Sequence, residues 1–120
     1  MSLGPEDLLQ ITVARFLRIA APALMWWHVP NGGSRHPGEA RKLKDMGTRA
    51  GVADLAFVLP DGRAAFIELK APKGRQTPEQ KTFEADCQTN TAPYALCRSL
   101  AEVETVLRGW GVTLRARSPE

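Results

Sequence analysis

The sequence predicts an α/β fold in which a mixed β-sheet lies between helices. Hydrophobic periodicity and turn residues divide the chain into elements in the order helix, strand, helix, strand, strand, helix, strand, helix. Residues 51–70, GVADLAFVLPDGRAAFIELK, contain the two central strands, because apolar runs flank a Pro-Asp-Gly-Arg turn there. A sheet covered by helices is a stable layer arrangement for this order of elements.

The composition is that of an ordinary globular domain. The 120 residues are 43% hydrophobic and 24% charged, so we expect one domain with a single core over residues 1–120. The formal net charge is +3, and residues 31–49 alone carry five basic and two acidic side chains. The positive excess is therefore concentrated in one segment, which fits an anionic partner.

Neither a secretory signal nor a membrane span is expected. Charged residues interrupt the first apolar region, and no apolar run is long enough to cross a bilayer. Cys87 and Cys97 lack metal-ligand spacing, so we expect buried thiols of a reducing compartment. These features indicate a cytoplasmic protein without a membrane partner, and a bacterial or phage origin would fit.

The first helix is expected from Pro5 to about Ala20. Proline suits the first turn, and Glu6 favours the positive end of the helix dipole, which by itself would explain this acid. A strand is expected at residues 25–29. Trp26 and Trp27 must point to opposite faces of that strand, so one of them is left for a second face or a subunit contact.

A turn at residues 30–34 and a short helix from Pro37 to Met46 are expected next. The glycines of the turn would let a phosphate approach, although a plain loop explains them as well. The helix carries Arg41, Lys42 and Lys44. Basic helix faces are usually just solvated, but this one directly precedes the acidic strands, which favours phosphate contact.

The central hairpin carries two carboxylates in apolar strands, where an unpaired charge is costly. Asp54 opens the first strand, and Glu68 lies near the end of the second. Side chains alternate along a strand, so Glu68 and Lys70 share one face. Charges that keep an edge strand from aggregating are an alternative explanation of these residues.

The rest of the chain is explained by loop and capping signals. A basic loop at residues 71–76 precedes a helix that begins with the capping box Thr77-Pro-Glu-Gln80, which fully accounts for Gln80 in structural terms. A strand at residues 93–97 and a helix from Ser99, with a capping box to Glu102, follow. Residues 112–117 are expected to form a last strand or a basic tail.

Asp54 and the Glu68-Leu69-Lys70 triplet resemble the core of the PD-(D/E)xK nucleases, and the wider chain resembles the VRR-NUC (virus-type replication-repair nuclease) family. Further residues carry this resemblance: Glu6, Gln10, the Pro-Asn-Gly-Gly turn at 30–33, Gly47, Gly51-Val-Ala-Asp-Leu and Gln80. Ala53 stands where the family pattern has proline, a residue that shapes backbone and carries no chemistry. The resemblance implies a restriction-endonuclease-like core.

The resemblance also implies a DNA endonuclease that depends on Mg²⁺ or Mn²⁺. Asp54, Glu68 and the Leu69 carbonyl would hold the ion, and Lys70 would orient or activate the attacking water. Glu6 and Gln80 would reach the site, although we expect no single rotamer of Gln80 to serve both the cap and the site. The DNA contacts are expected from Arg35, Arg41, Lys42, Lys44, Arg49, Lys73 and Arg75.

Small stand-alone members of this family suggest branched DNA, such as a four-way junction, cleaved by a homodimer. One of the tryptophans, Trp26, Trp27 or Trp110, is the expected subunit contact. A flap nuclease and a less selective DNase are alternatives within the same chemistry. A catalytically inactive DNA-binding domain and a small adaptor domain are alternatives of a different class.

The hairpin register gives a geometric prediction. A two-residue Asp-Gly turn would pair residue 60 with residue 63 and place Asp54 opposite Leu69, facing away from Glu68. A shared site requires Asp54 opposite Glu68, because directly opposed residues project from the same face. We therefore predict an odd-length loop, or a bulge that restores this parity.

Overall fold

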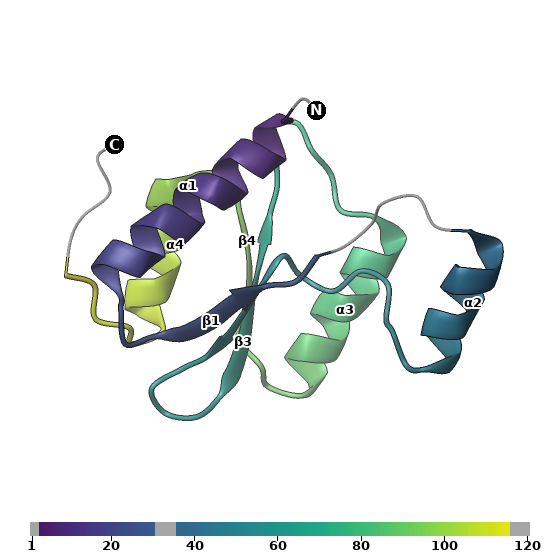
Figure 1. Cartoon of the computed structure of the whole chain (residues 1–120). Helices are drawn as coiled ribbons and strands as arrows, with labels where there is room; N and C mark the ends of the chain where they lie inside the picture. The colour runs from purple at the N-terminus through teal and green to yellow at the C-terminus, as the bar shows by residue number, and fades with distance from the viewer. Residues whose placement is uncertain (1–2, 31–35, 116–120) are drawn as a thin grey trace.

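The computed structural model describes residues 3–30 and 36–115. The order of elements agrees with the prediction (Figure 1). In chain order they are α1 (Pro5–Ala20), β1 (Met25–His28), α2 (Pro37–Asp45), β2 (Leu55–Val58), β3 (Ala64–Leu69), α3 (Pro78–Thr89), β4 (Tyr94–Cys97) and α4 (Leu100–Gly109).

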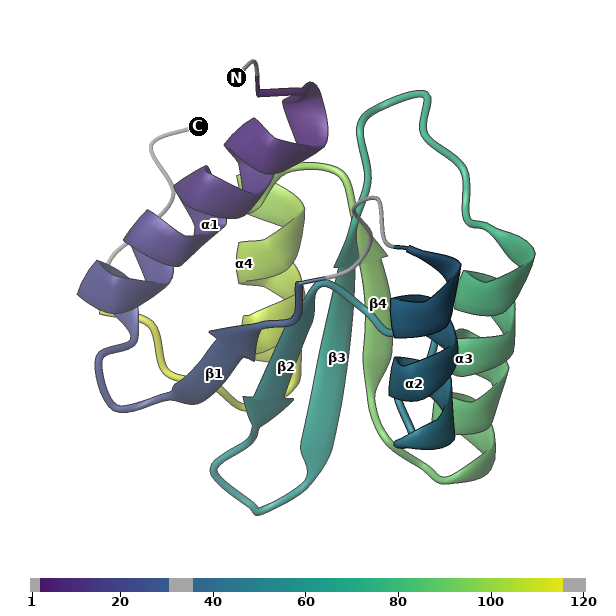
Figure 2. The same ribbon diagram turned by 45° about the vertical axis from the view of Figure 1, so that its right-hand side comes forward.

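The four strands form one mixed sheet in the order β1-β2-β3-β4. β1 and β3 both pair antiparallel with β2, and β4 pairs parallel with β3. α1 and α4 lie over one face, α3 lies over the other, and α2 lies on the outer side of α3 (Figure 2). The main core therefore fills the space between the sheet and α1 and α4, where it includes Leu17, Phe57, Ile67 and Leu107.

The hairpin of β2 and β3 has the predicted parity. Its pairs run from Leu55 opposite Ile67 to Val58 opposite Ala64, and the same register places Asp54 opposite Glu68. Leu59 N donates to Arg63 O at 2.9 Å, so the loop closes around three residues rather than two. Gly62 adopts a φ of 92°, the left-handed conformation that a three-residue hairpin loop requires. The prediction of an odd-length loop is confirmed.

Two local predictions need correction. Within residues 112–115 no strand forms; instead Val112 and Leu114 are buried in the main core, because Arg115 N donates to Ala20 O at 2.8 Å and holds the segment against α1. Ser99 caps α4 through the N–H of Glu102, but the Glu102 carboxylate accepts from the N–H of Arg98 rather than from that of Ser99. The predicted capping box is therefore displaced by one residue.

Within the part of the chain that the structure describes, every helix is too short or too polar to span a membrane.

Candidate active site

Asp54 lies immediately before β2, where neighbouring elements fix its backbone. Its carbonyl oxygen accepts from Val29 N at 2.8 Å and lies 3.0 Å from His28 Nδ1; His28 is the last residue of β1 and Val29 follows it directly. On the other side, Gly51 lies against the first turn of α3. A Cβ at position 51 would lie 2.4 Å from the carbonyl carbon of Glu79, so only glycine allows this approach.

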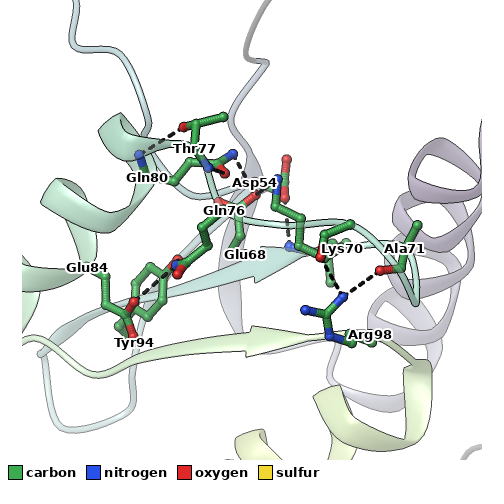
Figure 3. Close-up of polar contacts among 12 residues, drawn as sticks. Asp54, Glu68, Lys70, Ala71, Gln76, Thr77, Gln80, Glu84, Tyr94 and Arg98 are labelled. Carbon is green, nitrogen blue, oxygen red and sulfur yellow. Dashed lines mark hydrogen bonds and ion pairs between the residues drawn. The ribbon is translucent and has the colours of Figure 1, made fainter.

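The Asp54 carboxylate is held by the backbone of β3. Its Oδ2 accepts from the N–H of Leu69 at 2.7 Å (Figure 3). This bond joins the start of β2 to the end of β3. It aims the carboxylate at the position where Glu68 and Lys70 project from the same strand.

Glu68 is buried, with only 2% of the residue exposed. Its Oε2 accepts from Gln80 Nε2 at 3.1 Å and lies 3.9 Å from Lys70 Nζ. Its Oε1 is also buried but has no hydrogen-bond partner among the residues that the structure describes. A buried carboxyl oxygen without a partner is rare, and a proton shared with Asp54, an ordered water or a bound cation would each satisfy it.

The same surroundings strongly perturb the titration of Glu68. Burial is the largest cause that raises the pKa of this carboxyl well above its ordinary value of 4.5, and the nearby charge of Asp54 raises the pKa further. The ammonium group of Lys70 acts in the opposite direction and is the weaker influence. A buried carboxyl whose proton affinity is raised by a second carboxylate lies in an environment that favours a cation.

Gln80 corrects a prediction. Its Oε1 accepts from the N–H of Thr77 at 2.9 Å, which completes the capping box of α3, while its Nε2 donates to Glu68. The prediction that one rotamer would serve only the cap or only the site is wrong, because the oxygen and nitrogen of one amide point to different partners. The cap thereby holds the Nε2 donor in place over Glu68.

Glu6 lies in the first turn of α1 and lines a hollow of about 560 Å³ together with Asp54 and Leu69. Its negative charge contributes to the raised pKa of Glu68. The hollow is also lined by Leu3, Asp7, Gln10, Ile11, His28 and Pro30. The structure thus brings Glu6 to the same hollow as Asp54, as the resemblance implied.

Arg98, which the sequence did not single out, secures the loop that follows Lys70. Its Nη1 donates to the carbonyl oxygens of Ala71, Pro72 and Gly74 at 2.6, 3.2 and 2.9 Å (Figure 3). At the far end of the loop, Gln76 Nε2 contacts Glu84 and Tyr94. The loop is therefore held at both ends, and no sequence signal identifies an arginine at the end of β4 as its anchor.

Lys73 and Arg75 are exposed on this loop, and Arg41, Lys42 and Lys44 are exposed on α2. None of the residues of α2 is buried. Arg49 differs from these five residues, because it forms an ion pair with Asp86 and lies 5.1 Å from the ring centroid of Phe83. Arg35, the remaining predicted DNA contact, lies outside the described residues.

The residues present fit a hard divalent cation. Among the described residues, no three His, Cys, Asp or Glu side chains gather into a closed metal site. Asp54 and Glu68 occupy opposed positions of the hairpin, and their carboxylates, together with the Leu69 carbonyl, would supply oxygen ligands without enclosing an ion. Oxygen ligands that leave room for water suit Mg²⁺ or Mn²⁺ and disfavour zinc.

The raised pKa of Glu68 predicts how stability depends on pH without metal. Above pH 4.5 the unfolded chain releases this proton while the folded protein keeps it, so the free energy of unfolding falls as the pH rises. Glutamine has nearly the same shape as the protonated carboxyl group of Glu68 and is likewise uncharged. We expect Glu68→Gln to be more stable than the parent by about 1–2 kcal/mol at pH 8, and the difference to shrink towards pH 5. Urea unfolding in EDTA at both pH values measures the two free energies of unfolding. A parent protein more stable than Glu68→Gln at pH 8 would contradict the prediction.

Comparison with known proteins agrees with this geometry. A family model described as the VRR-NUC domain matches residues 5–101. A solved structure described as "VRR_NUC domain protein" is 21% identical, with a TM-score of 0.67 over 92% of this chain and 90% of its own. Another, described as "VRR_NUC domain", is 18% identical, with a TM-score of 0.62 over 90% of this chain and 99% of its own.

At these identities the two structures show the fold, a mixed sheet flanked by helices that is compatible with a restriction-endonuclease-like core. A search of curated proteins found no match. The family model spans most of the chain, and its range includes Glu6, Asp54, Glu68, Lys70 and Gln80. The chain therefore belongs to the VRR-NUC family of nuclease domains.

Proposed function

We propose that this protein is a divalent-metal-dependent endonuclease that hydrolyses phosphodiester bonds in DNA. The observation that carries the proposal is the meeting of Asp54, Glu68 and Lys70 at one place, where a buried oxygen of Glu68 has no partner within the described residues. An arrangement that is electrostatically costly without a cation is typical of a functional site rather than of a structural charge pair.

Asp54, Glu68 and the carbonyl oxygen of Leu69 would hold the Mg²⁺ or Mn²⁺ ion. When bound, the ion would lower the pKa of a water molecule and neutralise charge on the phosphate. The chain's own contribution is preorganisation, because the Leu69 N–H orients Asp54 and the capped Gln80 orients Glu68 before substrate arrives.

Lys70 would orient the attacking water and stabilise the negative charge that develops on the phosphate. Its side chain is only 8% exposed, so its ammonium group acts where solvent screens it weakly. Gln80 and Glu6 would act as positioning residues, the first through Glu68 and the second from the first turn of α1, in the hollow that it lines together with Asp54.

The test is a cleavage assay with four-way junction, flap, duplex and single-stranded DNA, each with Mg²⁺, with Mn²⁺ and with EDTA. We expect cleavage only with metal, and products that carry a 5′-phosphate. Binding without cleavage of any substrate would instead assign the chain to the catalytically inactive DNA-binding class.

We further propose branched DNA, such as a four-way junction, as the substrate of a homodimer, which would place the enzyme in DNA repair. A junction offers two equivalent strands, and a two-fold dimer would present two sites to them. Of the three tryptophans expected at the contact, Trp26 and Trp110 pack against the main core, and Trp27 is 46% exposed and would be available. Leu8 and Ile19 on α1 are 53% and 72% exposed and would supply further apolar contact area. Sedimentation of the protein at micromolar concentration tests the dimer.

The basic residues of α2 should bind phosphates and not bases. We expect the triple change of Arg41, Lys42 and Lys44 to glutamine to weaken binding about equally across DNA sequences. The slope of log affinity against log salt should become shallower by about 0.9 for each phosphate that the variant no longer neutralises. Filter binding at several salt concentrations measures this slope. An unchanged slope would identify these residues as ordinary surface charges.

A further inference from the structure

α2 stands apart from the rest of the fold (Figure 2). It has nine residues, and it makes no extensive contact with any other helix or strand that the structure describes. Within it only Leu43 is half-buried, and the other residues are exposed. By contrast, α1, α3 and α4 each bury at least two side chains. Burial against the core therefore does not stabilise α2.

A helix of this length is not stable on its own. Formation of the first turn is unfavourable, so isolated helices shorter than about 12–15 residues are marginal in water. The C-terminal end of α2 is capped, because Thr48 N donates to Leu43 O at 2.9 Å around Gly47, whose φ is 100°. At the N-terminal end, His36 provides no side-chain cap. One cap and no buried face leave helix and coil close in free energy.

The charge of α2 indicates which partner would stabilise the helix. It carries three basic residues, Arg41, Lys42 and Lys44, against two acids. None of the three forms an ion pair with another residue that the structure describes. Arg41 lies two positions before Leu43, about 200° around the helix from it, so Arg41 projects away from the half-buried side. A polyanion such as the DNA backbone would therefore supply the contacts that α2 lacks.

The segment that follows α2 is anchored independently of the helix. Arg49 forms an ion pair with Asp86 and lies 5.1 Å from the ring centroid of Phe83, which ties residue 49 to α3. Gly51 packs against the first turn of the same helix. These contacts begin beyond the end of α2 and involve none of its residues. The helix can therefore form or melt without displacing the strands that carry the candidate active site.

We propose that DNA completes α2. The helix is only partly formed in the free protein, and phosphates bound to Arg41, Lys42 and Lys44 shift the equilibrium to the helical form that the structure shows. The proposal rests on DNA being the substrate, as proposed above, and specifies how the protein holds it. Because part of the binding free energy is used to order the helix, helix propensity at positions that carry no charge becomes a determinant of affinity.

Hydrogen exchange with and without duplex DNA, in EDTA, tests the proposal without any need for cleavage. In the free protein we expect the amides of residues 40–46 to exchange nearly as fast as those of an unfolded peptide. Bound DNA should slow them roughly 10-fold or more, whereas the amides of α3 should be slow in both states. Since bound DNA also shields amides directly, a second measurement must separate helix formation from shielding.

Ala40→Gly makes that separation. Ala40 is exposed in the middle of α2, so glycine lowers helix propensity there without a change in charge. We expect the DNA affinity to fall about 5-fold, equivalent to about 1 kcal/mol, and the free energy of unfolding in urea to stay unchanged. Gly38→Ala should strengthen binding, because nothing lies within 4 Å of the added Cβ. Fluorescence anisotropy in EDTA measures both affinities.

Ala85→Gly is the matched control. Ala85 is exposed in the middle of α3, a helix that buries Phe83 and Cys87. The same substitution should there lower the free energy of unfolding and leave the DNA affinity unchanged, the reverse of the pattern for Ala40→Gly. A helix α2 that is fully formed in the free protein and folds together with the core would instead make Ala40→Gly behave like the control.

Slow exchange of α2 in the free protein, or unchanged affinity in both Ala40→Gly and Gly38→Ala, would overturn the proposal. Protection of α2 that grows with protein concentration in the absence of DNA would also overturn it and assign the helix to contact with a second copy. DNA binding without cleavage, with the effect of Ala40→Gly intact, would count against the nuclease function alone. Metal-dependent cleavage with no effect of Ala40→Gly on affinity would count against the role of α2 alone, so the two failures are distinguishable.

Discussion

Replacement of Asp54, Glu68 or Lys70 by alanine is expected to abolish metal-dependent cleavage of DNA while DNA binding largely survives. Each side chain would act on the ion, the water or the charge of the transition state, and removal of one such interaction typically costs about 10²–10³-fold in rate. The two carboxylates should cost more, because each substitution would remove a ligand of the ion. Single-turnover cleavage measures the rate, and anisotropy in EDTA measures the binding.

Asp61→Ala is the matched control for these variants. Asp61 is an exposed carboxylate on the hairpin loop whose partner is Arg63, so its replacement removes a negative charge without touching the site. This variant should cleave at the parental rate. Persistence of metal-dependent cleavage in Glu68→Ala would refute the assigned site, whatever the behaviour of the other variants.

Gly51→Ala is expected to destabilise the protein by roughly 3 kcal/mol or more and to reduce cleavage strongly. Gly51 has a φ of 80°, and an added Cβ would lie 2.4 Å from backbone atoms of Glu79 and 2.7 Å from Gln80 N. The left-handed backbone alone costs a residue with a side chain about 1–2 kcal/mol, and the collision must push α3 away from residues 51–54. That displacement would move Gln80 relative to Glu68 as well as Asp54.

Gly62→Ala separates the two contributions. Gly62 has a φ of 92°, but nothing lies within 4 Å of the Cβ that alanine would add. It should therefore show the backbone cost alone, with normal cleavage. Urea unfolding of both variants gives the difference in stability. Equal destabilisation of Gly51→Ala and Gly62→Ala would show that α3 shifts without a cost in stability, and that close packing at Gly51 is unimportant.

The site residues could be found in the sequence because their signals are local. Strand alternation puts Glu68 and Lys70 on one face, and the requirement that Asp54 share that face predicted the parity of the hairpin, which the register confirms. The capping box at Thr77 was equally visible, since its two hydrogen bonds join residues three apart. Each of these inferences uses only residues that are close along the chain or across one turn.

The contacts that complete the site join residues far apart in the sequence, and only the tertiary structure decided them. Gln80 meets Glu68 across 12 residues, and Arg98 reaches back 27 residues to Ala71. Each contact depends on where α3 or β4 packs against β3, which the composition of neither segment determines. The same holds for Trp27: the sequence did not decide which face of the sheet it occupies, and the register of β1 places it on the face of the Asp54 and Glu68 positions.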